Sequence, residues 1–206
     1  MSLKKSRSPS RSPDPRGADR VAILLEALSA SNKDTQKRER AFKELMQSAE
    51  DDPEALLPRW RQIAGLLKGG NAFSRYPAVF LITALAPADS GKRFERTFAD
   101  FFALLDDENI SVAAHVARLS GRIVRAVPRF EPRVTRRLLR AESTHFTKSR
   151  KELLKAYVIE AFGEYFPQTK SKKAVLTFVR DQLASSSPKA RKATKVFLEK
   201  WSAEAG

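Results

Sequence analysis

Cysteine is missing from this sequence of 206 residues. Its absence excludes disulfide frameworks, thiolate zinc sites, iron–sulfur clusters and a cysteine nucleophile. Histidine is almost as scarce, because His115 and His145 are the only two, and neither has a carboxylate at the helical spacing that would complete a set of metal ligands. We therefore predict no metal site and no cofactor.

The sequence also lacks the short motifs of common catalytic sites. It contains no glycine-rich phosphate loop of the GxxxxGK[ST] or GxGxxG type and no serine nucleophile elbow. The acidic residues Asp106, Asp107 and Glu108 fall in a predicted turn, where carboxylates commonly accept hydrogen bonds from the first N–H groups of the next helix. We predict a protein without enzymatic activity, and no residue is a catalytic candidate.

Long apolar runs are absent too. No run approaches the ~20 residues that a helix needs to cross a bilayer. The first residues lack the apolar stretch of a secretory signal. We therefore expect an intracellular, cytoplasmic protein that acts as a monomer and has no membrane partner.

The N-terminal segment differs in composition from the rest of the chain. Residues 1–17, MSLKKSRSPSRSPDPRG, contain no apolar side chain beyond Met1 and Leu3 and are rich in Ser, Arg and Pro. Such a segment cannot offset the entropy of ordering by burying apolar surface. We predict a disordered basic tail over 1–17, followed by one folded domain over 18–206.

From about Arg20 onward, the apolar residues recur with helical spacing. Val112, Val116, Leu119 and Ile123 follow one another at intervals of four, three and four residues, which places them on one face of a helix. The chain shows no sustained alternation of apolar and polar residues and no Asn-Gly hairpin signal. The sequence therefore predicts an all-α fold.

Proline and capping signals divide this helical region into antiparallel pairs. Asp52 before Pro53 and Ser187 before Pro188 each fit an N-cap followed by proline at the first helical position, and Ser74 can cap another helix. The predicted pairs are 18–30 with 36–49, 53–68 with 74–86, 91–105 with 109–127, 130–141 with 147–166, and 170–184 with 188–203.

The second helices of these pairs open at regular intervals. Their openings begin at residues 37, 74, 111, 149 and 190, and a period near 38 built from two helices is typical of an α-solenoid. The third pair, ALLDDENISVAAHVARLSGRIV, resembles the HEAT repeat in its Leu-Leu ending, its acidic turn and its small residues. The resemblance covers about 185 of the 206 residues. It implies a right-handed α-α superhelix of about five antiparallel helix pairs.

The HEAT resemblance also implies a structural ladder. In that family an Arg early in the second helix commonly pairs with an Asp of the turn between helices. The positions that match are Arg38 or Arg40, Arg75, Arg150 and Arg191 for the Arg, and Asp34 and Asp107 for the Asp. The third pair departs from this pattern, because Ala113 stands where the Arg is expected.

Lys and Arg outnumber Asp and Glu by 39 to 24, and the resulting charge of +15 indicates an anionic partner. Most of the excess lies in 128–168 and 169–206, at +4 and +6. In HEAT solenoids the second helices usually line the concave surface. The predicted basic strip on that surface is Arg118, Arg122, Arg125, Lys148, Lys151, Lys155, Lys189, Lys192 and Lys195. We predict a non-enzymatic scaffold that presents this strip to an acidic protein segment.

Three alternatives remain open. The strip could bind the phosphate backbone of a nucleic acid, or it could carry its charge for solubility alone. Alkylpurine DNA glycosylases are also built of HEAT-like repeats, but they place a carboxylate and aromatic residues together on the concave face. Here Trp60 and Trp201 are far apart in sequence, and Phe162, Tyr165 and Phe166 fall on the apolar face of their helix, which disfavours base stacking.

Overall fold

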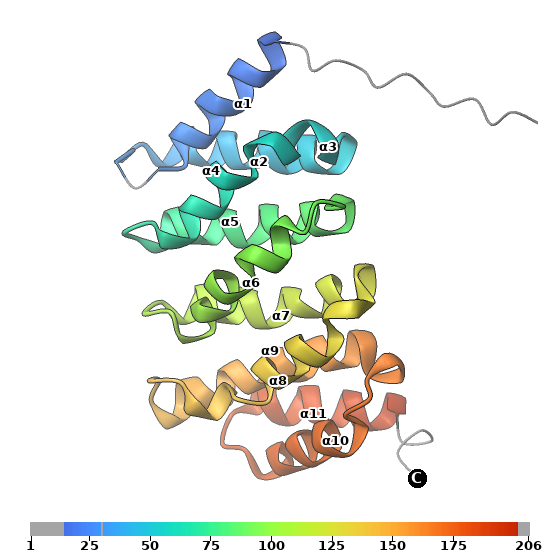
Figure 1. The fold of residues 1–206 in the computed structure, drawn as a ribbon. Coiled ribbons are helices and arrows are strands. Elements are labelled where there is room, and N and C mark those ends of the chain that lie inside the picture. Colours follow the sequence, from blue (N-terminus) through green and yellow to red (C-terminus); the bar gives the residue numbers. More distant parts are fainter. Residues whose placement is uncertain (1–14, 30, 202–206) are drawn as a thin grey trace, which may run out of the picture.

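The computed structural model describes residues 15–29 and 31–201, and within these ranges the chain is helical and contains no strand (Figure 1). The all-α prediction is confirmed. The predicted tail over 1–17 lies mostly outside the described residues, and the first helix begins at Pro15. No helix among the described residues is long and apolar enough to span a membrane.

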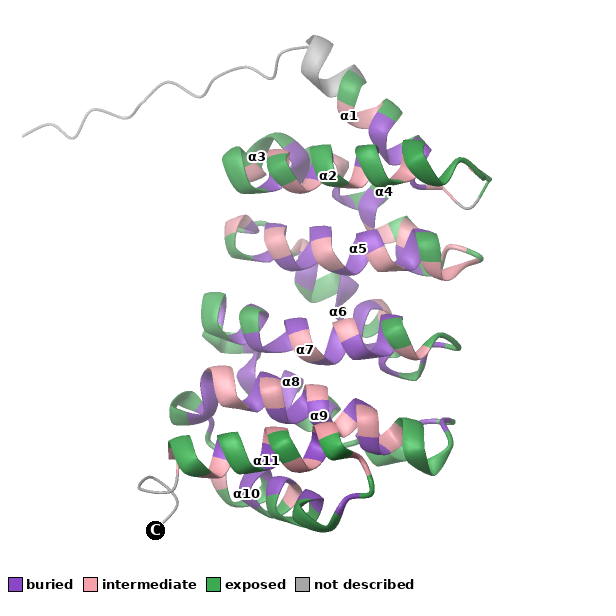
Figure 2. Ribbon diagram, turned by 180° about the vertical axis from the view of Figure 1, so that it is seen from behind, coloured by how far each residue is buried: buried purple, intermediate pink, exposed green. Residues whose placement is uncertain are grey.

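The helices form two layers. The second helices of the predicted pairs lie side by side in chain order, each in contact with the next (Figure 2). They are α2 (Thr35–Asp51), α5 (Ala72–Leu85), α7 (Ile110–Ala126), α9 (Lys148–Tyr165) and α11 (Pro188–Trp201). The other layer contains the shorter first helices, α1 (Pro15–Ala27), α3 (Pro53–Leu56), α4 (Trp60–Gly65), α6 (Arg93–Ala103), α8 (Glu131–Leu138) and α10 (Lys172–Arg180).

Short 3₁₀ segments follow or interrupt many of these helices. They are η1 (Leu57–Arg59), η2 (Leu66–Lys68), η3 (Ala86–Ala88), η4 (Leu104–Asp106), η5 (Pro128–Phe130), η6 (Ala141–Ser143), η7 (Phe166–Gln168) and η8 (Asp181–Ala184). The single helix predicted over 53–68 is wrong, because η1 separates α3 from α4. Pro58 lies at the start of η1, where its ring and its missing N–H disfavour a continuous α-helix.

The helix starts follow side-chain capping. Asp52 accepts a hydrogen bond from Ala55 N and Pro53 occupies the first position of α3, as predicted. The predicted cap at Ser74 is wrong. Asn71 caps α5 by accepting from Ser74 N at 3.1 Å, so the helix begins earlier and Pro77 lies inside it.

The core lies between the two layers, where the apolar faces of the first and second helices meet. Phe94, Phe98, Phe101 and Phe102 of α6 are all buried there, and Phe94 packs edge to face on Phe130 at 4.9 Å between ring centroids. Edge-to-face packing of this kind adds to the free energy gained from area burial alone. The phenylalanines of α6 therefore join the third pair to the fourth.

A buried polar cluster joins the fourth pair to the fifth. The carboxylate of Glu131 accepts hydrogen bonds from Thr135 Oγ1 at 2.9 Å and from Thr169 Oγ1 at 2.5 Å. The Thr135 hydroxyl also lies 2.8 Å from the hydroxyl of Tyr165, whose pKa is raised by burial. Glu131 is 4% exposed, so the only acidic side chain of α8 is withdrawn from the surface.

Helices α7 and α9 approach each other closely at Gly121 of α7. A Cβ atom at this position would lie 2.8 Å from the carbonyl oxygen of Ala161 and 3.0 Å from Glu164 Cβ, both in α9. Only glycine lets the two backbones come this near. Gly163 in α9 differs, because a Cβ there would meet only Phe197 at 3.8 Å, an ordinary contact.

We expect Gly121→Ala to lower the free energy of unfolding by about 1 to 3 kcal/mol, because the added methyl group must push α7 away from α9. Gly163→Ala is the matched control and should be neutral or stabilising by about 0.5 to 1 kcal/mol, since alanine favours the helix. Urea unfolding followed by circular dichroism measures both. Equal effects of the two substitutions would contradict the close packing at Gly121.

Candidate binding surface

The outward sides of α2, α5, α7, α9 and α11 form one continuous surface, which we call the second-helix face (Figure 2). Residues of intermediate exposure run along the middle of this face. It includes most positions of the predicted basic strip. Its chemistry changes along the layer, because α5 presents aromatic side chains without charge, whereas α2 and the helices from α7 onward carry exposed charged residues.

Helix α5 is unusual in carrying no charge on its outward side. Its residues of highest exposure are Phe73, Tyr76, Phe80 and Ala84, which follow one another at intervals of three or four and so share one face. Phe73 is 62% exposed. The only charged residue of the helix, Arg75, is buried. An outward stripe without charge on a surface helix is typical of a contact site.

Neighbouring helices extend this stripe into an aromatic patch, defined here as Phe42, Phe73, Tyr76, Phe80 and His115. The ring centroids of Tyr76 and Phe80 lie 4.7 Å apart, and Phe42 approaches both at 5.5 and 5.8 Å. His115 from α7 closes the patch at 4.9 Å from Tyr76 and 5.0 Å from Phe80. Three helices thus contribute to one cluster of rings.

His115 lies at the border between the patch and the charged side chains of α7. Its Nδ1 atom is buried and has no hydrogen-bond partner among the described residues. Burial lowers the pKa of His115, and the positive charge of Arg118 lowers it further. The imidazole is therefore neutral near pH 7 and belongs with the apolar residues.

The arginines of α7 surround one carboxylate. Arg118, Arg122 and Arg125 all act electrostatically on Glu164 of α9, and the closest ion pair is Arg125 Nη1 to Glu164 Oε2 at 3.6 Å. Burial raises the pKa of Glu164, and the three arginines oppose that rise. The group carries three positive charges and one negative charge, so it keeps a net positive charge beside the aromatic patch.

Several other residues of the predicted strip have internal partners. Lys155 forms an ion pair with Glu142 and only 14% of its side chain is exposed, so it is not an open part of the surface. Lys189 Nζ lies 2.6 Å from Glu160 Oε1 and above the ring of Tyr157.

The remaining lysines of the strip have fewer interactions with acidic side chains. Lys148 interacts electrostatically with Glu152. Like Arg118 and Arg122, Lys148 forms no ion pair with a described residue, and the same holds for Lys151, Lys192 and Lys195. The structure therefore keeps a smaller open basic region than the nine predicted residues imply.

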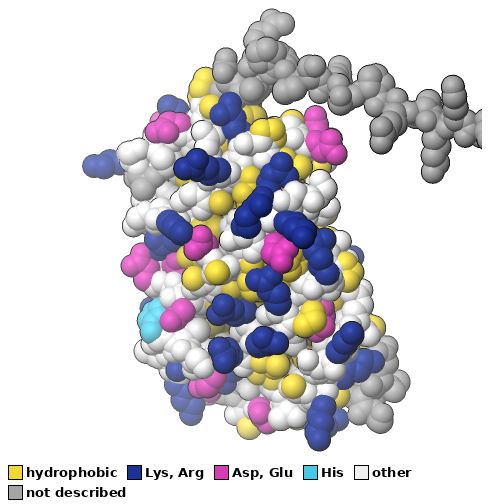
Figure 3. Space-filling model, in the orientation of Figure 1, with side chains coloured by type: hydrophobic (Ala, Val, Ile, Leu, Met, Phe, Trp, Pro, Cys, Tyr) yellow, Lys and Arg dark blue, Asp and Glu magenta, His cyan; other side chains and the backbone are white. Residues whose placement is uncertain are grey.

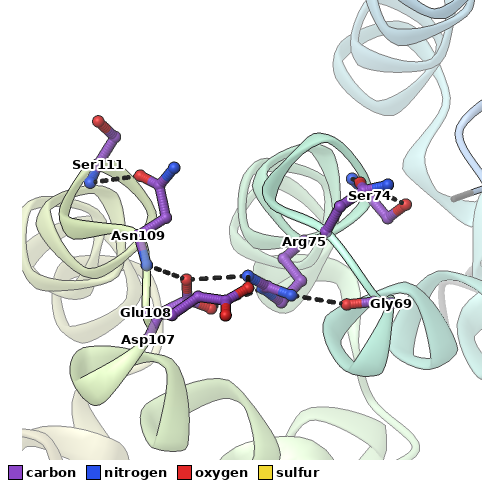
Figure 4. Close-up of polar contacts among 8 residues, drawn as sticks. Gly69, Ser74, Arg75, Asp107, Glu108, Asn109 and Ser111 are labelled. Carbon is purple, nitrogen blue, oxygen red and sulfur yellow. Dashed lines mark hydrogen bonds and ion pairs between the residues drawn. The ribbon is translucent and has the colours of Figure 1, made fainter. Parts of the chain in front are cut away.

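The implied ladder has one rung with the expected partners (Figure 4). Arg75 Nε lies 2.6 Å from Asp107 Oδ2, and Nη2 donates to Asp107 Oδ1 at 3.1 Å and to Glu108 Oε1 at 2.7 Å. Its Nη1 donates to the carbonyl of Gly69 at 2.8 Å. The two paired side chains are 9% and 3% exposed. Arg75 thereby ties α5 to the turn before α7.

The other ladder positions do not form such pairs. Arg191 donates to the backbone carbonyls of Ser185 and Ser186 at 2.6 and 3.0 Å, whereas Arg150 is exposed and has no ion pair with a described residue. Asp34 caps α2 by accepting from Lys37 N at 2.9 Å.

Arg38 shares the backbone contact that Arg75 and Arg191 make. It donates to the carbonyl of Asn32 at 3.1 Å. In all three cases the bond reaches six residues back, so the repeated feature is a bond to the turn backbone and not an Arg–Asp pair.

Between the fourth and fifth pairs a carboxylate makes the link instead. Glu152 accepts hydrogen bonds from Ser186 Oγ and from Ser187 N, the latter at 3.1 Å. The hydrogen bond from Ser186 is the main cause of the lowered pKa of Glu152. This link uses the residue two positions after Arg150, which explains how α9 is fixed without the predicted rung.

The surface depressions of the molecule lie away from this face. One is lined by Lys170, Ser171, Lys173 and other residues of α10, and another lies between α1 and the turn before α2. The described residues contain no group of three His, Asp or Glu side chains that could hold a metal ion. Trp60 is buried and donates from Nε1 to Thr97 Oγ1 at 2.9 Å.

The aromatic patch was not predicted from the sequence. Its signal is nevertheless present, because the chain carries no charged residue from Tyr76 to Ala88, although an outward helix face is normally polar. Which of these residues point outward depends on how α5 is rotated against its neighbours.

Comparisons with known proteins do not assign the chain to a family. No family model and no curated protein matches it. Among solved structures, the crystal structure of an engineered protein from the Northeast Structural Genomics Consortium is similar over 89% of this chain and 96% of its own. The identity is 12% and the TM-score is 0.44, and a similarity at this level carries no conclusion about function.

We expect Arg75→Gln to lower the free energy of unfolding by about 3 kcal/mol or more, because it leaves the buried carboxylate of Asp107 without its cation. Arg150→Gln is the matched control, since it changes the equivalent position of the repeat at an exposed site, and its effect should stay within about 0.5 kcal/mol. Urea unfolding of both variants provides the measurement. A loss of less than about 1 kcal/mol in the free energy of unfolding of Arg75→Gln would contradict a stabilising role of the Arg75–Asp107 pair.

The lowered pKa of His115 predicts a pH dependence of stability. Below the unfolded-state value of about 6.5 the unfolded chain takes up a proton that the folded chain resists, so the free energy of unfolding falls as the pH is lowered. We expect the stability difference between the wild type and His115→Phe to shift in favour of His115→Phe between pH 7.5 and 5.5. A difference that does not change with pH would contradict the burial of a neutral imidazole.

Proposed function

We propose that this chain is a non-enzymatic binding module, a HEAT-like solenoid whose concave side is the second-helix face, and that this face holds an acidic protein segment. The observation that carries the proposal is that the aromatic patch and the arginines of α7 are adjacent on one face. His115 touches the rings of Tyr76 and Phe80, and Arg118 lies one turn further along the same helix. Apolar anchoring and positive charge therefore meet at one place.

A protein segment fits this combination better than a nucleic acid does. Phe42 lies edge to face on Phe80 at 80° and His115 on Tyr76 at 79°, while Tyr76 and Phe80 are tilted at 45° to each other, so these four rings cover part of one another. Bases need exposed ring faces on which to stack. Apolar side chains of a peptide need only a desolvated apolar surface, with charged contacts at its rim.

The carboxylates on the same face support this choice. Glu160 and Glu164 of α9 lie among the cations and pair with Lys189 and Arg125. A continuous row of phosphates would meet these negative charges as well as the positive ones. A segment with a few acidic residues at suitable spacing can contact the arginines without placing a negative charge next to Glu160 or Glu164.

Selection of peptides tests the function. Random peptides displayed on phage and selected on the immobilised full chain should be enriched in sequences that place an aromatic or aliphatic residue next to Asp or Glu. A selected peptide should bind Phe73→Lys and Arg122→Glu about tenfold more weakly than the wild type, a change of about 1.4 kcal/mol. Fluorescence anisotropy measures the affinity.

The control variants carry the same types of substitution at exposed positions outside the second-helix face. Ile23→Lys alters a residue of α1 that is 57% exposed, and Arg61→Glu alters an exposed arginine of α4. Both should leave the affinity unchanged within about twofold. Equal losses in the control variants, or selected peptides without acidic residues, would reject the proposed site.

A further inference from the structure

The opposite side of the molecule carries a second positively charged surface. It is formed by the first helices, and Figure 3 shows Lys and Arg side chains gathered over the region of α6, α8 and α10. The densest part is an arginine stripe along η5 and α8, whose members are all exposed. These members are Arg129, Arg133, Arg136, Arg137 and Arg140.

The arginine stripe contains no exposed carboxylate. The segment from Pro128 to Arg140 has one acidic residue, Glu131, and its carboxylate is buried and hydrogen-bonded to Thr135 and Thr169. The charge of the stripe is therefore not compensated within its own helix. The strip on α7 and α9 differs, because Glu160 and Glu164 lie among its cations.

Two arginines of the stripe lie over aromatic rings at cation–π distance. The guanidinium of Arg133 lies 4.0 Å from the ring centroid of Phe98, and that of Arg129 lies 4.9 Å from that of Phe130. Both rings belong to the core. Stacking fixes the plane of a guanidinium and leaves its N–H groups directed along the surface. Arg133 also lies 3.7 Å from Glu95 Oε1, a partly exposed and weak pair.

The side chains of the other three arginines form no ion pair or hydrogen bond with a described residue. Arg136 and Arg137 continue the stripe at helical spacing near the end of α8, and Arg140 follows in the turn after it. The turn before α10 is joined to the start of α8 by the hydrogen bond from Thr169 to Glu131, and it carries exposed Lys170. Positive charge therefore extends from the start of the stripe to the turn before α10.

Large exposed apolar side chains are missing from the part of this surface formed by η5, α6 and α8. The exposed large hydrophobic residues of the described chain are Ile23, Phe73, Leu183 and Val196, of which Leu183 lies in η8, after α10. A protein partner normally needs an apolar anchor at the centre of its contact. A partner held here relies on charge and on N–H donors alone.

We infer that the arginine stripe binds the phosphodiester backbone of duplex nucleic acid without regard to sequence. Arginine N–H groups match phosphate oxygens in pairs. At a helical rise of 1.5 Å per residue the stripe extends over roughly 16 Å, a length along which a duplex presents on the order of ten negative charges. This site is separate from the second-helix face and does not depend on the function proposed there.

Binding of a labelled random-sequence DNA duplex of ~20 base pairs to the full chain, followed by fluorescence anisotropy over a range of salt concentrations, tests the inference. The triple variant Arg136→Gln, Arg137→Gln and Arg140→Gln should weaken binding about tenfold or more at low salt. It should also reduce the slope of log K against log salt by about two to three, because three phosphate contacts are lost.

The matched control removes the same charge from the other face, through Arg118→Gln, Arg122→Gln and Lys192→Gln. It should bind DNA within about twofold of the wild type. Equal weakening by both triple variants would show that only net charge matters, and absence of binding by the wild type at low salt would also reject the site. Circular dichroism of each variant confirms folding, and Arg140→Glu alone provides a milder second variant that must also weaken binding.

A competitor distinguishes nucleic acid from an acidic protein. Polyglutamate with the same number of charges as the duplex should displace it poorly, because carboxylates spaced along a flexible chain lose more conformational entropy on binding. Displacement by polyglutamate at the same charge concentration would overturn the assignment to a phosphodiester backbone.

Discussion

Direct contact between neighbouring second helices sets the position of every outward side chain described above. At Gly121, α7 and α9 approach so closely that a single added methyl group would meet the backbone of Ala161. Because the two helices are this close, Glu164 of α9 lies among the arginines of α7. The same layer brings Phe42, Tyr76 and His115 together from three different helices. A surface assembled from adjacent helices is therefore only as well defined as their packing.

The two faces of the molecule separate two kinds of positive charge. On the second-helix face the cations are mixed with Glu160 and Glu164 and lie next to aromatic rings. On the first-helix side the arginine stripe is free of exposed acid, and two of its members rest on buried phenylalanines. Net charge alone does not distinguish these surfaces, although both contribute to the same total of +15. The chemistry around each cation decides which kind of anion it suits.

The sequence was sufficient for the helical class and for most helix positions, because apolar spacing and proline mark them directly. It predicted less well where a residue's role depends on its neighbours in space. The buried Arg75–Asp107 pair agrees with the ladder implied by the HEAT resemblance, whereas Arg150 is exposed and Glu152 takes over the link. Nothing in the sequence shows that Lys155 turns toward Glu142 or that α5 exposes its aromatic residues. The arginines of η5 and α8 are not part of the predicted strip, because the HEAT resemblance implies a concave surface lined by second helices.

Glu164 gives the arginines of α7 an internal anion in the absence of any ligand. Its closest pair is with Arg125 at 3.6 Å, and it interacts electrostatically with Arg118 and Arg122. An acidic ligand at these arginines would compete with Glu164 for their positive charge, so part of its free energy of binding would replace an interaction that the folded chain already has. An internal carboxylate of this kind lowers the affinity for anions that offer charge alone and favours ligands that also anchor on the rings nearby.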